Sequence, residues 1–317
     1  IGTSMLENTS SIEAGRLLNS SFVNLSIGGS KLADRALILE RTLGISTLSI
    51  KNIILSLDGF DRIGNYREMR PMSLYSYLYD DVYFNDIKIY FNLKYILVAG
   101  CQIVRKNIEY CSDLLRDVDN LNEWYSDKSQ SDRFGGIDNW IDLGSGQQVK
   151  EALNEIVEVS KCVRENNCKL SGNRYQHFEE SFNEYILKFS KSNPGVNFHL
   201  IFPPYSRLKY AIWSKANPKE FKSYLQAIKY IVLKSEHFQN TIVYGFDNLE
   251  FVDDISNYKD TTHYHPDINS MMLYSIRDKK NILNSDNIDS YIKKITQQAQ
   301  VYDISVIADK IQDKLKL

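Results

Sequence analysis

Two short polar stretches, one at each end of the chain, contain the residue types of an acyl-transfer site. The stretch IGTSM contains Ser4, and the stretch NYKDTTHYHP contains Asp260 and His263. A serine hydroxyl becomes an effective nucleophile when a histidine takes its proton and a carboxylate orients that histidine. The Asp-x-x-His spacing lets the carboxylate reach one imidazole nitrogen while the other faces a hydroxyl. We therefore predict a hydrogen-bonded row of Ser4, His263 and Asp260.

Ser4 and His263 each also have a structural explanation. Ser4 precedes MLENTSSIEAGRLL, a stretch with helical character, and a serine in front of a helix is commonly its N-cap. His263 could equally be a buried loop histidine without chemistry. His265 is a second candidate base, although it lies just before Pro266, where a helix is expected to begin. We assign the base to His263 because the Asp-x-x-His spacing belongs to it.

The elements that must position these residues alternate between strands and helices. Short apolar runs predict strands, and stretches with helical spacing of apolar residues separate them. Strands joined by helices indicate an α/β fold with a parallel sheet covered on both faces. We expect a strand before Ile1, strands within 21–27, 50–60, 196–206 and 241–247, and helices within 31–44, 176–195 and 218–236.

The middle of the chain, residues 62–171, has a different composition. It includes WYSDKSQSDRFGGIDNWIDLGSGQQ, which is rich in Ser, Asp, Gly and aromatic residues. Such a composition favours an insertion with helices and long loops over one face of the sheet. We therefore expect a single domain, 1–317, with an insertion at about 62–171.

Polar stretches follow several of the expected strands: GTS, GGS, LDGFD and PPYS. Ligands of an open parallel sheet bind at the carboxyl ends of its strands, so these stretches are expected at one edge. Nearby, Tyr205 and Trp213 could stack on sugar rings or cover the edge of the sheet. Arg207 could bind an acidic sugar or form a salt bridge with a neighbouring side chain.

Composition excludes some classes of partner. The 317 residues are 43% hydrophobic, and 38 basic against 40 acidic side chains give a net charge of −2. This balance does not indicate binding to nucleic acid or to an anionic membrane. No apolar run is long enough to span a bilayer. Because IGTS resembles the end of a strand and its turn, we expect residues upstream that could include a signal or membrane anchor, and a periplasmic or membrane-anchored location is favoured over the cytoplasm.

The cysteines do not indicate a metal site. Cys101, Cys111, Cys162 and Cys168 lack C-x-x-C spacing, and the five histidines do not cluster with them. We expect no metal and no other cofactor. The stretch CVRENNC either closes a short disulfide loop in an oxidising compartment or holds two free thiols in the cytosol.

On these motifs the chain resembles the SGNH, or GDSL-like, hydrolase family. IGTSM is similar to the Gly-Asp-Ser block, with Thr3 in place of the usual Asp, NLSIGGS to the second block and DTTHYHP to the last. The resemblance implies a flavodoxin-like three-layer α/β sandwich with a mainly parallel sheet. It also implies that Ser4 is the nucleophile, His263 the base and Asp260 the orienting acid, with the backbone N–H groups of Ser4 and Gly29 as oxyanion donors.

The third block departs from the family pattern. The family ends this strand with Gly-Asn-Asp, whose Asn side chain donates to the oxyanion, whereas this chain reads SLDGFD with Phe60 at the Asn position. Asp58 is the nearest polar residue, but an ionised carboxylate repels an oxyanion, so we expect it to orient a substrate hydroxyl or the loop. Loss of one donor typically costs a hundredfold or more in rate, about 3 kcal/mol.

The resemblance implies one of two functions. The first is a serine esterase or O-acyltransferase that acts on O-acyl groups, chiefly acetyl, of a carbohydrate, as in similar proteins that modify bacterial surface polysaccharides. The second is a module that binds carbohydrate or assists polysaccharide assembly with weakened or lost catalysis. The presence of Ser4, Asp260 and His263 favours the enzyme, and Phe60 is the argument against it.

Overall fold

The structure is a computed structural model that describes residues 1–45, 49–60, 82, 84, 123–143, 146–168, 175 and 177–315. The elements below belong to one unit made of Ile1–Ile63 and Asn122–Leu317. Much of the expected insertion, together with Cys101 and Cys111, lies outside the described residues.

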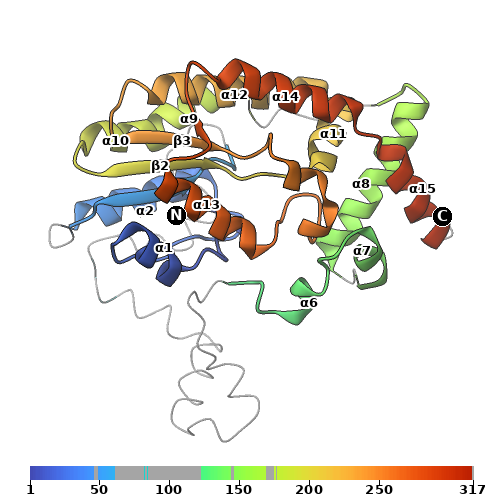
Figure 1. The fold of residues 1–317 in the computed structure, drawn as a ribbon, viewed down its shortest axis with the longest axis horizontal. Helices are drawn as coiled ribbons and strands as arrows, with labels where there is room; N and C mark the ends of the chain where they lie inside the picture. Colours follow the sequence, from blue (N-terminus) through green and yellow to red (C-terminus); the bar gives the residue numbers. More distant parts are fainter. Residues whose placement is uncertain are drawn as a thin grey trace, which may run out of the picture. The chain divides into compact units, whose positions relative to one another are not determined.

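A four-stranded sheet forms the centre of this unit, in the order β1-β2-β3-β4 (Figure 1). β1 (Asn52–Ser56), β2 (Asn197–Phe202) and β3 (Thr241–Gly245) are parallel, and β4 (Ile282–Leu283) is antiparallel to β3. In the register, Leu55 pairs with Leu200, which pairs with Val243, and all three are buried. The prediction of an α/β fold with a mainly parallel sheet is thus confirmed, and so are its strands within 50–60, 196–206 and 241–247.

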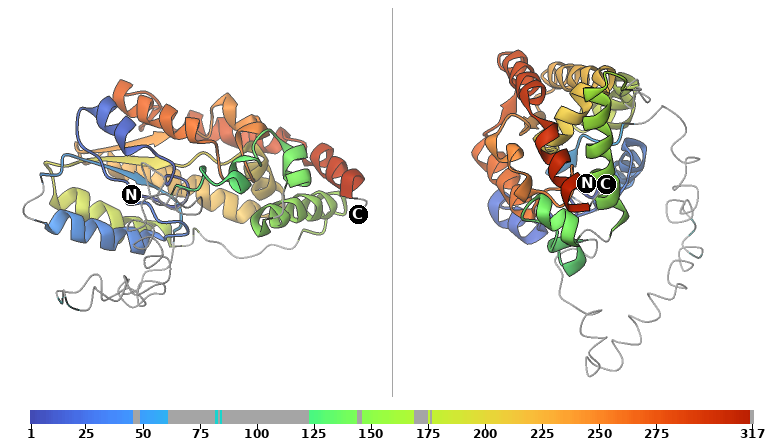
Figure 2. Two further views of the ribbon diagram at one scale, coloured as in Figure 1. Left: turned by 90° about the horizontal axis from the view of Figure 1, so that it is seen from below. Right: turned by 90° about the vertical axis from the view of Figure 1, so that its right-hand side faces the viewer.

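Helices cover both faces of the sheet, which explains why its strands are apolar on both sides. α1 and α13 pack together on one face, and α2 packs with α9 and η3 on the other (Figure 2). The helices predicted within 31–44, 176–195 and 218–236 are present, the second with a π-helical turn in its middle. The full set is α1 (Ser11–Leu18), α2 (Leu32–Gly44), α6 (Lys128–Ser131), α7 (Ile137–Leu143), α8 (Gln147–Arg164), α9 (Phe178–Phe182), π-helix η3 (Asn183–Leu187), α10 (Lys188–Ser192), α11 (Arg207–Ala216), α12 (Pro218–Ser235), 3-10 turns η4 (Glu250–Asp253) and η5 (Ile255–Asn257), α13 (Pro266–Asp278), α14 (Ile288–Val301) and α15 (Ile304–Leu315).

One expected strand is not formed. Residues 21–27 have no regular secondary structure and are not part of the sheet, so the prediction of a strand there is wrong. The Ile27 N–H does reach the carbonyl oxygen of Gly2, at 2.9 Å. Along the rest of the segment, side-chain bonds of Asn24 hold the backbone instead of a strand ladder. Val23 is 75% exposed, and Leu25 and Ile27 are exposed as well, so the apolar residues of this segment are not buried as those of a covered strand would be.

A disulfide joins Cys162 and Cys168, whose Cα atoms lie 4.8 Å apart at the end of α8. The structure therefore has the first of the two forms considered for CVRENNC. Within the described ranges, no helix is both long and apolar enough to cross a bilayer.

A buried carboxylate, that of Asp247, lies two residues after the end of β3. Asp247 is fully buried and accepts hydrogen bonds from the hydroxyl groups of Tyr210, Tyr224 and Tyr291. Burial raises the pKa of Asp247 to about 6, although these hydrogen bonds oppose the shift. The folded state thus holds this proton more tightly than the unfolded chain does.

We expect this group to make stability fall as pH rises. Between the ordinary Asp pKa of 3.8 and the folded value of about 6, the native state binds more protons, so the free energy of unfolding decreases with pH. The effect is at most about 3 kcal/mol. Asp247→Asn lacks this titration. The free energy of unfolding of Asp247→Asn minus that of wild type, measured with urea, should therefore be larger at pH 7 than at pH 4. The exposed Asp286→Asn is the control, and an unchanged difference between Asp247→Asn and wild type at the two pH values would contradict the prediction.

Candidate active site

The turn that holds Ser4 is fixed beside β1. The Ile1 nitrogen donates to the Ile54 carbonyl oxygen at 2.8 Å, and the Ser56 N–H donates to the Ile1 carbonyl oxygen at 3.2 Å. A β-carbon at position 2 would lie 2.8 Å from Ser56 Oγ, so any residue larger than Gly2 would displace that side chain. The chain then turns, with the Leu6 N–H bound to the Thr3 carbonyl oxygen. Ser4 therefore lies in a turn at the carboxyl end of β1.

Ser4, His263 and Asp260 form the predicted hydrogen-bonded row. Ser4 Oγ is 2.8 Å from His263 Nε2, and His263 Nδ1 is 2.7 Å from Asp260 Oδ2. These distances lie within the range expected of a nucleophile, its base and an orienting acid. The alternative role for Ser4 is not observed, because Ser10 is the N-cap of α1 and accepts from the Glu13 N–H.

The Asp260 carboxylate organises the loop around His263. Its Oδ1 accepts hydrogen bonds from the Thr262 N–H, the Thr262 hydroxyl and the His263 N–H, which leaves Oδ2 for the imidazole. Burial alone would raise the pKa of Asp260, but the charge of His263 and these hydrogen bonds hold it well below its usual value. Asp260 is therefore an anion that can orient Nδ1–H, and His263 Nε2 is then the acceptor for the Ser4 hydroxyl proton.

The histidine loop is attached to the rest of the site at both ends. The Ser206 hydroxyl and N–H both donate to the Thr261 carbonyl oxygen, at 2.6 and 3.2 Å. The Tyr264 hydroxyl donates to the Met5 carbonyl oxygen at 2.8 Å, which joins the loop directly to the serine turn. The row is thus held by contacts outside the three residues themselves.

His265, the alternative base, has a structural role. It is the N-cap of α13, where its Nδ1 accepts from the Asp267 N–H at 3.3 Å. Its Nε2 lies 2.8 Å from the Tyr125 hydroxyl. Both ring nitrogens therefore have partners other than Ser4, and the assignment of the Ser4 contact to His263 is confirmed.

A glycine turn lies next to the serine turn. The Gly2 carbonyl oxygen accepts from the Ile27 N–H and the Ser30 hydroxyl, and these two bonds flank Gly28 and Gly29. Gly29 is exposed. Its φ angle is +71, which lies in the left-handed region that favours glycine. Within the part of the chain that the structure describes, the Ser4 and Gly29 N–H groups have no hydrogen-bond partner.

Glu7 holds this glycine turn in place. Its Oε1 accepts from the Gly28 N–H at 2.5 Å. Burial raises the pKa of Glu7, and the Gly28 N–H, His263 and Lys259 partly offset that rise. The Gly28 donor is thus occupied, which distinguishes it from Gly29.

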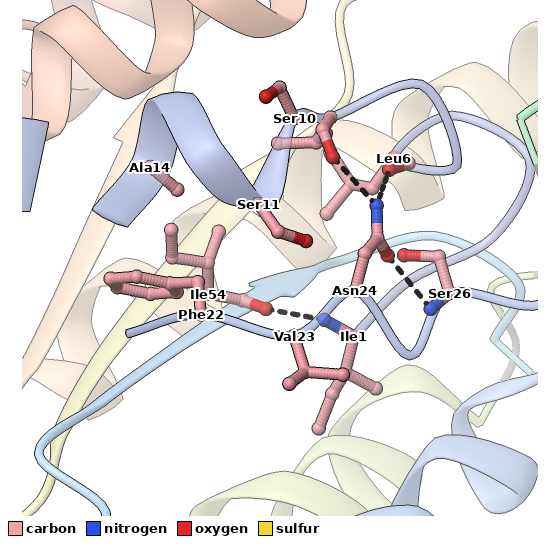
Figure 3. A pocket seen from close by; sticks show the side chains of 11 residues that line it. Ile1, Leu6, Ser10, Ser11, Ala14, Phe22, Val23, Asn24, Ser26 and Ile54 are labelled. Carbon is pink, nitrogen blue, oxygen red and sulfur yellow. Dashed lines mark hydrogen bonds between the residues drawn. The ribbon is translucent and has the colours of Figure 1, made fainter. Parts of the chain in front are cut away.

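Asn24 fastens the segment before the glycine turn to the serine turn. Its amide nitrogen donates to the carbonyl oxygens of Leu6 and Thr9, and its oxygen accepts from the Ser26 N–H (Figure 3). The crevice in this view has a mostly apolar lining that includes Phe22 and Ile54. Neither Ser4 nor His263 lines it, so it lies apart from the row described above.

Asp58 orients the loop, the second of its two expected roles. Its Oδ1 lies 3.0 Å from Nη1 of the fully buried Arg35, and its Oδ2 accepts from the Thr3 hydroxyl at 2.6 Å. Phe60 is also buried and packs against Tyr175, with ring centroids 5.7 Å apart. The Phe60 side chain is thus part of the core.

The three candidate sugar contacts have packing roles in this structure. Arg207 is fully buried, and its Nε donates to Asp253 at 2.8 Å, so it forms the salt bridge that was one of its alternatives. Trp213 is buried among aromatic rings, one of which belongs to the half-buried Tyr205. In this structure Trp213 and Tyr205 therefore pack against each other and against other aromatic rings.

Trp124 is a site residue that the sequence analysis missed. Its indole Nε1–H donates to the Ser4 carbonyl oxygen at 2.9 Å, and its ring meets His263 edge-on with centroids 5.8 Å apart. Lys259 was missed as well, and its Nζ lies 3.6 Å from the centroid of the Trp124 ring. The aromatic stretch around Trp124 was visible, but nothing in its spacing linked it to Ser4.

Among the described residues, no three His, Cys, Asp or Glu side chains converge as metal ligands. Comparison of the chain with protein-family models, curated proteins and solved structures finds no match.

We expect the buried Arg35–Asp58 pair to be important for stability. Arg35→Met leaves the Asp58 carboxylate buried without its cation, which typically costs about 3–5 kcal/mol. Arg16→Met, at an exposed arginine of α1, is the control and should change little. Urea unfolding measures both variants, and equal midpoints for the two would contradict the prediction.

Proposed function

We propose that the protein is an SGNH-type serine esterase or O-acyltransferase that acts on O-acyl groups of a carbohydrate, with acetyl as the expected group. The observation that carries the proposal is the 2.8 Å contact between Ser4 Oγ and His263 Nε2, with Asp260 on the other imidazole nitrogen. A helix cap or a loop histidine requires no such row. The carbohydrate as acyl carrier comes from the family resemblance.

The reaction proceeds in two transfers of the acyl group. Ser4 Oγ attacks the ester carbonyl carbon while its proton moves to His263 Nε2, and Asp260 stabilises the resulting imidazolium. The N–H groups of Ser4 and Gly29 donate to the oxyanion. The C–O bond to the leaving alcohol breaks as that oxygen takes the proton from Nε2. Water or a sugar hydroxyl then gives a proton to Nε2 and attacks the acyl-Ser4 ester, which releases an acid or a new ester and returns the proton to Ser4.

The arrangement of the chain supports the family resemblance. Ile27 lies beside Gly2, Ile1 lies beside β1, and β1 lies beside β2. The serine turn, the glycine turn and the loop at Asp58 are thereby brought to the same edge, as a flavodoxin-like order of segments requires. The Cys162–Cys168 disulfide supports a location outside the reducing cytosol.

A second function is favoured by one observation. Phe60 occupies the position of the third oxyanion donor and is buried in the core, and its ring has no N–H or O–H group to donate. A carbohydrate-binding or assembly module that has lost turnover would tolerate this. The intact row at Ser4 favours the enzyme over the module.

Covalent labelling tests the enzyme. A serine-directed fluorophosphonate should modify Ser4, and the adduct should be absent in Ser4→Ala and lost in His263→Ala, because a serine without its base is a poor nucleophile. His265→Ala is the matched control, since the His265 ring contacts Asp267, Tyr125 and Phe134 rather than Ser4. Mass spectrometry locates the adduct. A folded wild-type protein that is neither labelled nor active on a small acetyl ester would support the binding module.

Asp260→Asn should impair turnover less than Ser4→Ala or His263→Ala. The base and nucleophile remain, but the amide no longer holds the imidazole tautomer that accepts from Ser4. Initial rates on an activated acetyl ester measure the three variants. A rate for Asp260→Asn equal to that of wild type would show that Asp260 serves the loop fold alone.

A further inference from the structure

We propose that Trp124 and Lys259 are a positioning pair for the reaction: the Lys259 ammonium holds the indole, and the indole holds the Ser4 backbone and the His263 ring in register. This inference rests on the proposed function and adds two residues to its site. Neither side chain is given a chemical step.

Trp124 makes contacts on several sides. Its indole N–H binds the Ser4 carbonyl oxygen, and its ring edge packs against His263 at an interplanar angle of 87°. Its backbone N–H donates to Asn8 Oδ1 at 3.1 Å, as does that of the next residue, and its ring stacks on Phe134. A shift of the indole would therefore move both the nucleophile and the base.

Lys259 precedes the orienting acid in the chain and reaches back over the indole. Only 3% of the residue is exposed, its Nζ sits 3.6 Å from the ring centroid, and the same nitrogen donates to Gln130 Oε1 at 2.8 Å. A cation over an indole face is attracted by the ring quadrupole, more strongly when water is excluded. The contact thus ties the histidine loop to the segment that contains Trp124.

The charges around Lys259 make this contact sensitive to pH. Burial lowers the pKa of Lys259 to about 8, and Arg133 lowers it further, while Asp260, Glu7 and Asp127 oppose the shift. The ammonium is therefore present below about pH 8 and is lost above it. Deprotonation of Lys259 therefore removes the cation–π attraction to the Trp124 indole.

Labelling rates test the positioning role. Trp124→Phe removes the indole donor and Lys259→Met removes the charge but keeps the stem, and each should slow fluorophosphonate labelling of Ser4 by about tenfold or more, because small misplacements of reacting groups are costly. Lys259→Arg should restore most of the rate. The control is Lys209→Met, since Lys209 lies over the Trp213 ring, at 5.7 Å from its centroid, and its rate should match wild type.

Fluorescence of Trp124, taken as wild type minus Trp124→Phe, is the second readout. It should change with a midpoint near pH 8, and Lys259→Met should abolish the change. Equal labelling rates in wild type, Trp124→Phe and Lys259→Met would overturn the positioning role and leave the proposed function intact. If wild-type Ser4 is not labelled, the proposed function fails, and the fluorescence titration alone then decides whether the Trp124–Lys259 contact exists.

Discussion

The buried ion pair between Arg35 and Asp58 is the interaction on which the geometry of the serine turn depends. The guanidinium is fully buried and donates to the carboxylate of Asp58 and to the carbonyl oxygens of Ser56 and Asp58. The second carboxylate oxygen receives the Thr3 hydroxyl, immediately before Ser4. A buried charge pair is tolerated when hydrogen bonds satisfy its remaining atoms, as they do here. α2, the end of β1 and the serine turn are thereby fixed to one another.

The second half of the site is built independently. Asp260 organises its own loop through backbone and hydroxyl donors, and Ser206 anchors that loop at Thr261. The two halves then meet through side chains, the Tyr264 hydroxyl on Met5 and the Trp124 indole on Ser4. The 2.8 Å contact between Ser4 and His263 is a consequence of these bonds. It does not depend on the attraction between serine and histidine alone.

The side chains of the loop after β1 stabilise the fold. Asp58 is engaged by Arg35 and Thr3, and Phe60 packs on Tyr175. Gly59 permits the turn between them, at φ +64, where a β-carbon would press on the Ser30 carbonyl oxygen and the Arg35 guanidinium. On the proposed function, oxyanion stabilisation then falls on the N–H groups of Ser4 and Gly29, and accurate placement of the Ser4 backbone becomes more important.

Sequence alone determined the features that depend on local pattern. Apolar runs predicted β1, β2 and β3, helical spacing predicted α2 and α12, and the Asp-x-x-His spacing selected His263 over His265 for the contact with Ser4. Tertiary structure alone decided that residues 21–27 lie outside the sheet and that Trp213 is buried. It also decided that Trp124 contacts Ser4 and that Lys259 contacts Trp124. Periodicity and spacing report on neighbours along the chain, whereas burial and long-range contacts depend on which distant segments pack together. No local pattern contains that information.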